Sequence, residues 1–152
     1  MAGNATTQVS TTYKVIYNFI GFLSPLAQAC DLSLGTSCSP LSNSGVAKLG
    51  SAIPVKFKIT DSSGTPFIAS SLAALFTLQA VPNSTLGPPS GSPVLTFCGA
   101  GGCTGSSTER FDTTNNQYIV NADTSALAAG CYDIVLSLND AKVYWTFICL
   151  QP

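Results

Sequence analysis

The chain has 152 residues and a net charge of −1, and its charged share of 9% lies well below the usual share of about 25%. This length suits one domain with its own hydrophobic core, and the near-neutral charge gives no long-range field for gathering nucleic acid or anionic lipid. The chain has no histidine, which excludes Ser-His-Asp and Cys-His catalysis and His-containing metal sites.

The N-terminal residues 1–12 are rich in Ser and Thr, and we interpret them as a flexible arm before a single β-sandwich domain at 13–152. They lack the basic region and hydrophobic stretch of a signal peptide. The longest apolar runs, Val15–Leu23 and Val143–Leu150, are too short to cross a bilayer, so we expect no membrane insertion.

Strand patterns recur along the rest of the chain, separated by turn-rich segments, whereas helical patterns are short. Short strands at this spacing predict an all-β fold: an immunoglobulin-like, two-sheet antiparallel sandwich of about seven strands. The predicted strands are Tyr13–Leu23, Ile53–Thr60, Ala74–Val81, Pro93–Cys98, Gln117–Asn121, Cys131–Leu138 and Lys142–Leu150.

The strand at Ile53–Thr60 has the clearest alternation of apolar and polar residues. Lys56 and Lys58 fall on its polar face, and Pro54 lies near its start, where a missing N–H is tolerated. We expect the lysines to be solvated and the other face to enter the core. The residues of that face are Ile53, Val55, Phe57 and Ile59.

The segment Cys131–Leu150 predicts a β-hairpin with its loop at residues 139–141. This register places Cys131 opposite Cys149, at a separation near that of a disulfide. Just upstream, Leu127–Tyr132 has the form L-x-x-G-x-Y of a tyrosine corner, in which the phenol bonds to the backbone a few residues earlier. Gly130 there permits an unusual backbone angle.

Three segments, Tyr17–Leu26, Leu49–Ile59 and Phe111–Asp140, resemble the bacterial PxKF-type extracellular domain. The residues of structural interest are Pro54, Lys56 and Phe57 of the P-V-K-F motif, with Gly130 and Tyr132 of the corner. The matched positions are Tyr17, Phe19, Gly21, Phe22, Pro25, Gly50, Ser51, Pro54, Val55, Lys56, Phe57, Gly130, Cys131, Leu138 and Asp140.

The resemblance implies a secreted or cell-surface β-sandwich module, of a kind commonly appended to larger proteins and without assigned catalysis. Two features depart from the family pattern. Ala141 stands where the family usually has Gly, and the insertion Ala29–Lys48 is longer than usual.

The cysteines are even in number and include no C-x-x-C pair, which favours disulfides and an oxidising, extracellular or cell-surface location. Two pairing schemes are open. The local scheme joins 30–38, 98–103 and 131–149, whereas the resemblance implies 98–131, which leaves 103–149 and 30–38. The six cysteines are Cys30, Cys38, Cys98, Cys103, Cys131 and Cys149.

The sequence gives little support for a covalent cross-link, a metal site or a phosphate-binding site. An isopeptide bond from Lys56 or Lys58 needs a buried Lys, Asn and carboxylate together, and the spacing singles out no such set. Asp112–Asn116 lacks the rhythm of a calcium loop, and Gly99–Gly102 lacks the Lys-Ser/Thr of a phosphate-binding loop. We therefore expect no catalytic residue, cofactor or metal, with a small hydrolase as a remote alternative.

The segments Tyr13–Leu23 and Val143–Leu150 are apolar on both faces, although a sandwich strand needs only one buried face. Either the chain's own loops or its insertion cover the second face, or this face packs against another subunit. The second option predicts self-association or contact with other surface proteins. Its candidate interface residues are Tyr13, Val15, Tyr17, Tyr144, Trp145 and Phe147.

These observations predict a non-enzymatic extracellular structural module: a self-assembling or adhesive subunit of a surface fibre or a larger cell-surface protein. The arm at Ala5–Thr12 would be free to add a strand to a neighbour. The alternative is a carbohydrate- or protein-binding accessory module, with Tyr17, Tyr144 or Trp145 as its platform.

Overall fold

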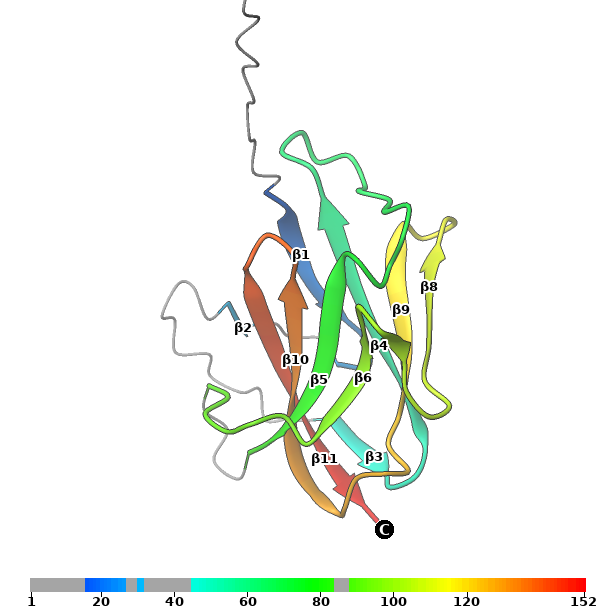
Figure 1. Ribbon diagram of the computed structural model, residues 1–152, viewed down its shortest axis with the longest axis vertical. Helices are drawn as coiled ribbons and strands as arrows, with labels where there is room; N and C mark the ends of the chain where they lie inside the picture. Colours follow the sequence, from blue (N-terminus) through cyan, green and yellow to red (C-terminus); the bar gives the residue numbers. More distant parts are fainter. Residues whose placement is uncertain (1–15, 27–29, 32–44, 84–87) are drawn as a thin grey trace, which may run out of the picture.

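The computed structural model describes residues 16–26, 30–31, 45–83 and 88–152. Two β-sheets face each other across one core (Figure 1). The described residues include no helix, and so none that is long and apolar enough to span a membrane. Every pairing between named strands is antiparallel except that of β3 with β11.

The first sheet, which we call sheet A, contains four strands in the order β1-β4-β9-β8. A bulge between Phe19 and Gly21 interrupts the pairing of β1 with β4. In the described part of the chain, β1 and β8 are the two edges of this sheet. The strands are β1 (Asn18–Leu23), β4 (Ala52–Thr60), β8 (Thr108–Asp112) and β9 (Gln117–Asp123).

The second sheet, sheet B, has the strand order β2-β11-β10-β5-β6-β7 in the described residues, and β3 also pairs with β11. The short strands β2 and β3 pair with different stretches of β11, at Tyr144–Trp145 and Ile148–Gln151 respectively. The strands are β2 (Cys30–Asp31), β3 (Gly45–Lys48), β5 (Phe76–Pro82), β6 (Leu95–Gly99), β7 (Gly102–Cys103), β10 (Gly130–Leu138) and β11 (Val143–Gln151).

The all-β, two-sheet architecture predicted from the sequence is confirmed. The seven predicted strands correspond to β1, β4, β5, β6, β9, β10 and β11, with boundaries that differ by a few residues. The sequence analysis missed β2, β3, β7 and β8. Three of these are only two to four residues long, and β8 reads TERFD, in which charged residues obscure the apolar alternation.

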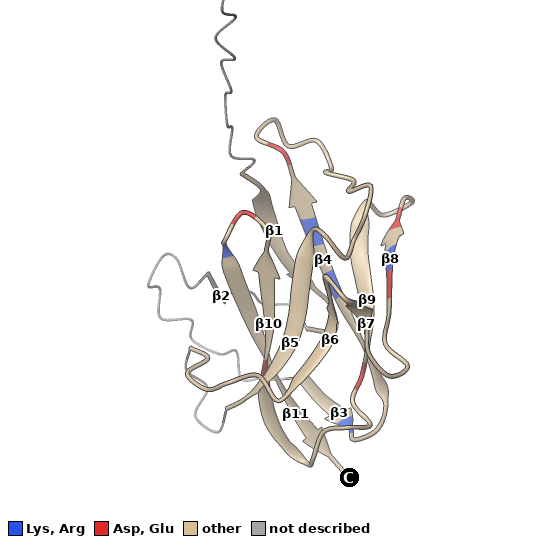
Figure 2. Cartoon of the chain, in the orientation of Figure 1, with Lys and Arg blue, Asp and Glu red and all other residues tan. Residues whose placement is uncertain are grey.

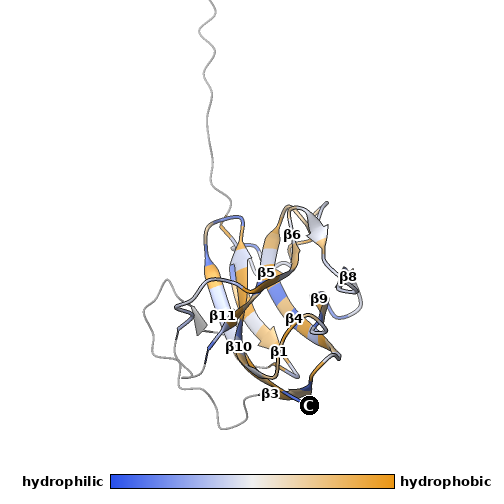
Figure 3. Cartoon of the chain, turned by 60° about the horizontal axis from the view of Figure 1, so that its bottom comes forward, coloured by the Kyte–Doolittle hydropathy of each residue, from blue (hydrophilic) through white to orange (hydrophobic). Residues whose placement is uncertain are grey.

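Strand β4 shows how the sequence pattern builds the core. The side chains of its apolar face are all buried, while Lys56 and Lys58 alternate with them and lie on the outer face. Figure 2 marks the basic positions of β4 in blue, and Figure 3 shows orange and blue bands along the strand. The Phe57 ring lies 5.3 Å from that of Tyr118 on β9 and 5.2 Å from that of Phe76 on β5. The contact with Tyr118 lies within sheet A, and the contact with Phe76 joins the two sheets.

The loop of the β10–β11 hairpin also holds the start of the domain. Asp140 is buried, and its Oδ2 accepts a hydrogen bond from the backbone N–H of Tyr17 at 3.1 Å. Its Oδ1 accepts from the N–H of Lys142 at 3.0 Å, and Lys142 Nζ donates to the carbonyl of Tyr17 at 3.3 Å. The segment entering β1 is therefore fixed to a turn more than a hundred residues away in sequence.

Candidate interaction surfaces

Two disulfides link neighbouring strands of sheet B. Cys98 bonds to Cys103 across β6 and β7, and Cys131 bonds to Cys149 across β10 and β11. The predicted opposition of Cys131 and Cys149 is confirmed, and the 98–131 pairing implied by the family resemblance is wrong. Cys38 and the side chain of Cys30 lie outside the described residues. The two bonds favour an oxidising environment.

The tyrosine corner has the predicted geometry. The Tyr132 hydroxyl donates to the carbonyl oxygen of Ala128 at 3.0 Å, while its ring is buried in the core. Gly130 has a φ of 154°, which a residue with a Cβ rarely adopts. The motif thus fixes the entry of the chain into β10.

Three of the predicted contact residues are buried within the single chain. Tyr17 and Tyr144 belong to the core, and Tyr144 stacks on the ring of Phe19 with 4.0 Å between centroids. Trp145 is only 3% exposed, and Phe147 is half-buried. The platform predicted at Tyr17, Tyr144 and Trp145 is therefore not open to a ligand in this conformation. Tyr13 and Val15 lie outside the described residues.

The outer face of sheet B carries a second, smaller hydrophobic cluster. Val81 of β5, Val135 of β10 and Trp145 of β11 are buried together, with the half-buried Val143 packed against them. These strands are adjacent in the sheet, so their outward side chains meet. The chain itself therefore covers the second apolar face at Trp145, which was one of the two alternatives open from the sequence.

Asp133 lies on the same outer face and is fully buried. Asn83, which follows β5, donates from Nδ2 to Asp133 Oδ2 at 2.7 Å, whereas Asp133 Oδ1 has no hydrogen-bond partner among the described residues. Burial raises the pKa of this carboxyl to about 6, against the smaller opposing effect of the hydrogen bond from Asn83. The site favours a neutral carboxyl because a charge there is poorly solvated.

The two edges of sheet A differ in chemistry. Within five residues β8 carries Glu109, Arg110 and Asp112, the kind of charged edge that discourages pairing with another chain. The six residues of β1, NFIGFL, include no charge. Edge β1 is therefore the less protected of the two.

Isoleucine side chains make this edge apolar on its solvent side. Ile20, the extra residue of the β1 bulge, is 54% exposed, and Ile16 just before the strand is 60% exposed. We call Ile16, Ile20 and the outward backbone of β1 the β1 edge. Of the large hydrophobic side chains in the described residues, the only others so exposed are Val46, Ile68 and Val94.

Basic side chains gather on the outer face of sheet A. The register places Lys56 and Lys58 of β4 and Arg110 of β8, two strands away, on the same face, and Figure 2 shows basic positions in blue on both strands. Lys56 and Arg110 both pair with Ile119 of β9, from opposite sides. Ile119 points outward but is only 4% exposed, as expected if the flanking aliphatic stems cover it. We call Lys56, Lys58 and Arg110 the cationic face.

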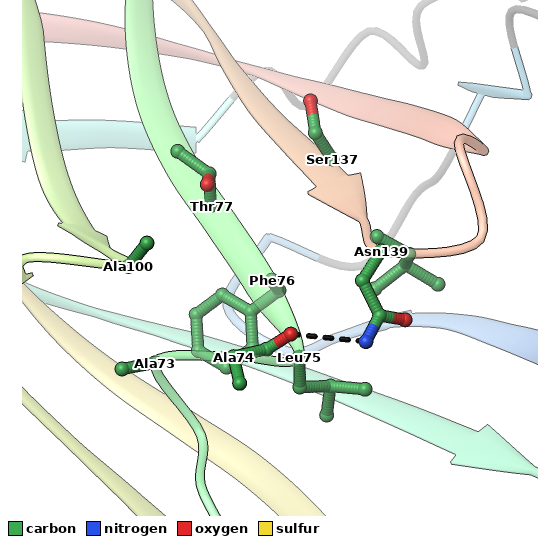
Figure 4. Close-up of a pocket in the computed structure, with 9 residues that line it drawn as sticks. Ala73, Ala74, Leu75, Phe76, Thr77, Ala100, Ser137 and Asn139 are labelled. Atoms are coloured by element: carbon green, nitrogen blue, oxygen red, sulfur yellow. Dashed lines mark hydrogen bonds between the residues drawn. The ribbon is translucent and has the colours of Figure 1, made fainter.

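A hollow of about 250 Å³ lies beside the end of β10 (Figure 4). Its polar side chains are Thr77, Ser137 and Asn139, and Asn139 Nδ2 already donates to the carbonyl of Ala74 at 2.9 Å. The remaining lining is small or aliphatic, apart from one phenylalanine, and carries no charge. This chemistry offers van der Waals contact but no acid, base or nucleophile of altered reactivity.

Glu109 lies beside the Cys98–Cys103 disulfide. Its carboxylate and the two sulfurs lie within 4.8 Å of one another, and burial raises the pKa of the carboxyl. Its Oε2 is buried and finds no hydrogen-bond partner in the part of the chain that the structure describes. The sulfurs are bonded to each other, so neither is a thiolate that could bind a metal.

Asp112 organises the loop Asp112–Asn116, whose sequence lacks the rhythm of a calcium loop. Its carboxylate accepts from the N–H groups of Thr114 and Asn115 and from the side chains of Asn115 and Gln117. These hydrogen bonds lower the pKa of Asp112, and the one from the Asn115 side chain has the largest effect. The loop is held by hydrogen bonds from the protein's own groups, which is the arrangement of a polar hairpin turn.

The sequence analysis did not single out Arg110, Ile16 or Ile20. The alternation of TERFD, with Phe111 and Glu109 directed inward and Arg110 outward, is the signal that could have placed Arg110 beside the lysines. No local signal could have identified Ile20, because its exposure results from a bulge in the pairing with β4.

No family model, curated protein or solved structure matches this chain.

Proposed function

We propose that the chain is a non-enzymatic, extracellular structural module that self-associates, as a subunit of a surface fibre or as part of a larger cell-surface protein. One observation carries this proposal: sheet A has an uncharged edge at β1, with exposed Ile16 and Ile20, while its other edge is charged. A free apolar strand edge is a template for pairing with another chain.

The occupant that we assign to the β1 edge is the N-terminal arm of a second copy. The segment TTQVSTTY at residues 6–13 contains four Thr, one Val and one Tyr, residue types that favour extended strands. A chain of this kind spans roughly 3.3 Å per residue when extended, so eight residues can match the length of β1. Donation from one copy to the next is head-to-tail, and such contacts build filaments when they do not close into rings.

The immunoglobulin-like and PxKF-type assignments belong to the same proposal. They are supported by the P-V-K-F residues on β4, the tyrosine corner at Tyr132 and the facing antiparallel sheets. The disulfides support an oxidising location. A module of this kind supplies contact surfaces and spacing.

The test is the oligomeric state of the purified chain as a function of concentration, measured by light scattering after size-exclusion chromatography. We expect the chain to form multimers, and we expect Ile20→Lys to shift the population to monomer, because a charge at this edge opposes strand addition. Val94→Lys is the matched control: Val94 is 58% exposed, and it lies outside sheet A in the loop before β6.

Deletion of residues 1–12 tests the role of the arm separately from the role of the β1 edge. We expect the deleted protein to be monomeric and to bind a synthetic peptide of residues 4–13, and Ile20→Lys in that background should abolish peptide binding. A monomer for the unaltered chain at high concentration, or multimers that persist after the deletion, would contradict the assigned arm exchange.

A further inference from the structure

We propose that the cationic face of sheet A binds a linear acidic polysaccharide. Lys56, Lys58 and Arg110 are three of only six basic residues in the whole chain, yet they project from one side of one sheet. Binding at this face is a separate property from self-association and requires no contact through the β1 edge.

These cations are not neutralised by the protein's own acids. In the described part of the chain, no ion pair joins any of the three to an Asp or Glu. The acidic residues at the ends of the face, Asp112 and Asp123, accept hydrogen bonds from loop backbone N–H groups instead. Hydrogen bonds, chiefly from the Asn115 side chain to Asp112 and from the Ser125 N–H to Asp123, lower the pKa of both carboxyls. Because no carboxylate of the described residues forms an ion pair with the three cations, their charge is available to an external anion.

The spacing of the charges suits an extended ligand. Lys56 and Lys58 are two residues apart on one strand, or about 7 Å, and Arg110 is two strands from Lys56, or about 10 Å. The position between Lys56 and Arg110 is Ile119, and the next row along the sheet adds an amide and a hydroxyl, since Asn121 Nδ2 donates to Thr108 Oγ1 at 3.2 Å. A polyuronate presents the complementary pattern: carboxylates at regular intervals, separated by hydroxyl groups.

The same face lacks what other anionic partners need. Single-stranded nucleic acid is held by stacking on aromatic side chains, and the outward residues of β4, β8 and β9 include no aromatic ring. Membrane surfaces are bound through clusters of about four to eight basic residues. A protein partner needs a buried aromatic or aliphatic anchor, whereas the outward Ile119 is covered. A hydrated polyanion is therefore the anionic partner that best suits this face.

The experiment measures binding of the full chain to immobilised polygalacturonate over a series of sodium chloride concentrations. We expect measurable affinity at low salt that falls as salt rises, since charge contacts with a polyanion release counterions. Dextran sulfate serves as a second anionic polymer, so that carboxylate and sulfate sources are distinguished, and uncharged dextran serves as the neutral polymer.

The decisive variant is Lys58→Gln/Arg110→Gln, which removes two charges and leaves Lys56 over Ile119. We expect about a tenfold loss of affinity and a salt dependence shallower by about one to two ions. The matched control is Lys48→Gln/Lys142→Gln, which changes the net charge equally; Lys48 lies on β3 and Lys142 next to the hairpin loop. Thermal melting of both variants checks that each is folded.

Several outcomes overturn the proposal. These are equal binding to uncharged dextran, equal loss in the control variant, no binding to either anionic polymer, or tighter binding to duplex DNA or to phosphatidylglycerol vesicles than to both polysaccharides. Because Ile20→Lys adds no change at these three positions, failure of self-association leaves this test intact, and the reverse also holds.

Discussion

At the scale of single residues, the most unusual group is the carboxyl of Asp133. It is fully buried between β5 and β11, and burial raises its pKa from 3.8 to about 6. Asn83 Nδ2, the nitrogen to which a glycan would be attached in the sequon Asn-Ser-Thr, is engaged in the hydrogen bond to this carboxyl. This hydrogen bond holds Asn83 against sheet B.

The raised pKa predicts how stability depends on pH. The folded state binds a proton at Asp133 more tightly than the unfolded state, so this group lowers the free energy of unfolding as pH rises from about 4 to about 6, and the loss is complete above that range. We expect Asp133→Asn, which keeps the shape but not the charge, to raise the unfolding free energy at pH 7 by about 1–2 kcal/mol.

Urea unfolding of both proteins at several pH values measures this effect. The difference in unfolding free energy between the variant and the parent should shrink toward zero near pH 4. Hydrogen bonds lower the pKa values of Asp61, Asp112 and Asp123, but these residues are the same in both proteins, so their effects on stability at acid pH cancel. A difference that stays constant with pH would show that the carboxyl is already charged without penalty, contrary to our account.

Ala141 adopts a left-handed backbone conformation that is unusual for a residue with a Cβ. It has a φ of 70° in the β10–β11 loop, and it stands where the resembled family usually has Gly. A left-handed conformation costs a non-glycine residue about 1–2 kcal/mol, whereas glycine adds about 0.4–1 kcal/mol of unfolded-state entropy. We expect Ala141→Gly to raise the unfolding free energy by about 0.5–1 kcal/mol.

The matched comparison is Ala128→Gly, at a position whose φ is not positive and whose carbonyl accepts from Tyr132. There the added flexibility has no strain to relieve, so that variant should lose stability. Denaturant midpoints of the two variants give the answer, and a loss of stability in Ala141→Gly would refute the strain argument.

At the scale of elements, the β10–β11 hairpin organises both sheets. It pairs along its length, carries a disulfide near its open end, and binds the entry to β1 through Asp140 at its loop. The Cys131–Cys149 bond closes a loop with a sequence separation of 18 residues. Such a bond stabilises chiefly by restricting the unfolded chain.

We expect Cys131→Ala/Cys149→Ala to lower the unfolding free energy by about 3 kcal/mol. Hydrogen exchange should show that the β10 and β11 amides remain protected in the folded variant, because the backbone ladder does not depend on the sulfurs. Urea titration of the oxidised parent and the variant provides the measurement. A change below about 1 kcal/mol would mean that the hairpin is closed in the unfolded state too.

The edges of sheet A illustrate why element chemistry matters for function. Strand β8 was missed from the sequence because its charges mask the alternation, and those same charges protect it as an edge. Strand β1 was predicted easily because it is apolar, which is also the property that leaves it open to pairing. The recognisability of a strand and its tendency to associate thus share one cause.

At the scale of the whole molecule, the two proposals use adjacent parts of sheet A. A strand added at the β1 edge would extend this sheet and bring several copies into one assembly. Self-association would then repeat the cationic face along an assembly. An acidic polymer contacting many copies would gain avidity although each face holds only three charges.

Much of this fold could be predicted from local pattern. The alternation on β4, the corner at Tyr132 and the opposition of Cys131 with Cys149 are set within a strand or a hairpin, and each agrees with the structure. These features depend on side-chain direction along an extended chain, which has a period of two wherever the strand is placed.

The candidate surfaces required the tertiary structure. Whether Trp145 is covered depends on Val81 and Val135 from strands far away in sequence, and the grouping of Arg110 with Lys56 depends on β9 lying between β4 and β8. Cross-strand neighbours are chosen by the packing of the whole chain, and neither their identity nor the exposure of a given face is encoded in a short segment. The sequence by itself thus determined the seven predicted strands and the inward face of β4, while long-range pairing decided which outward residues stand together in solvent.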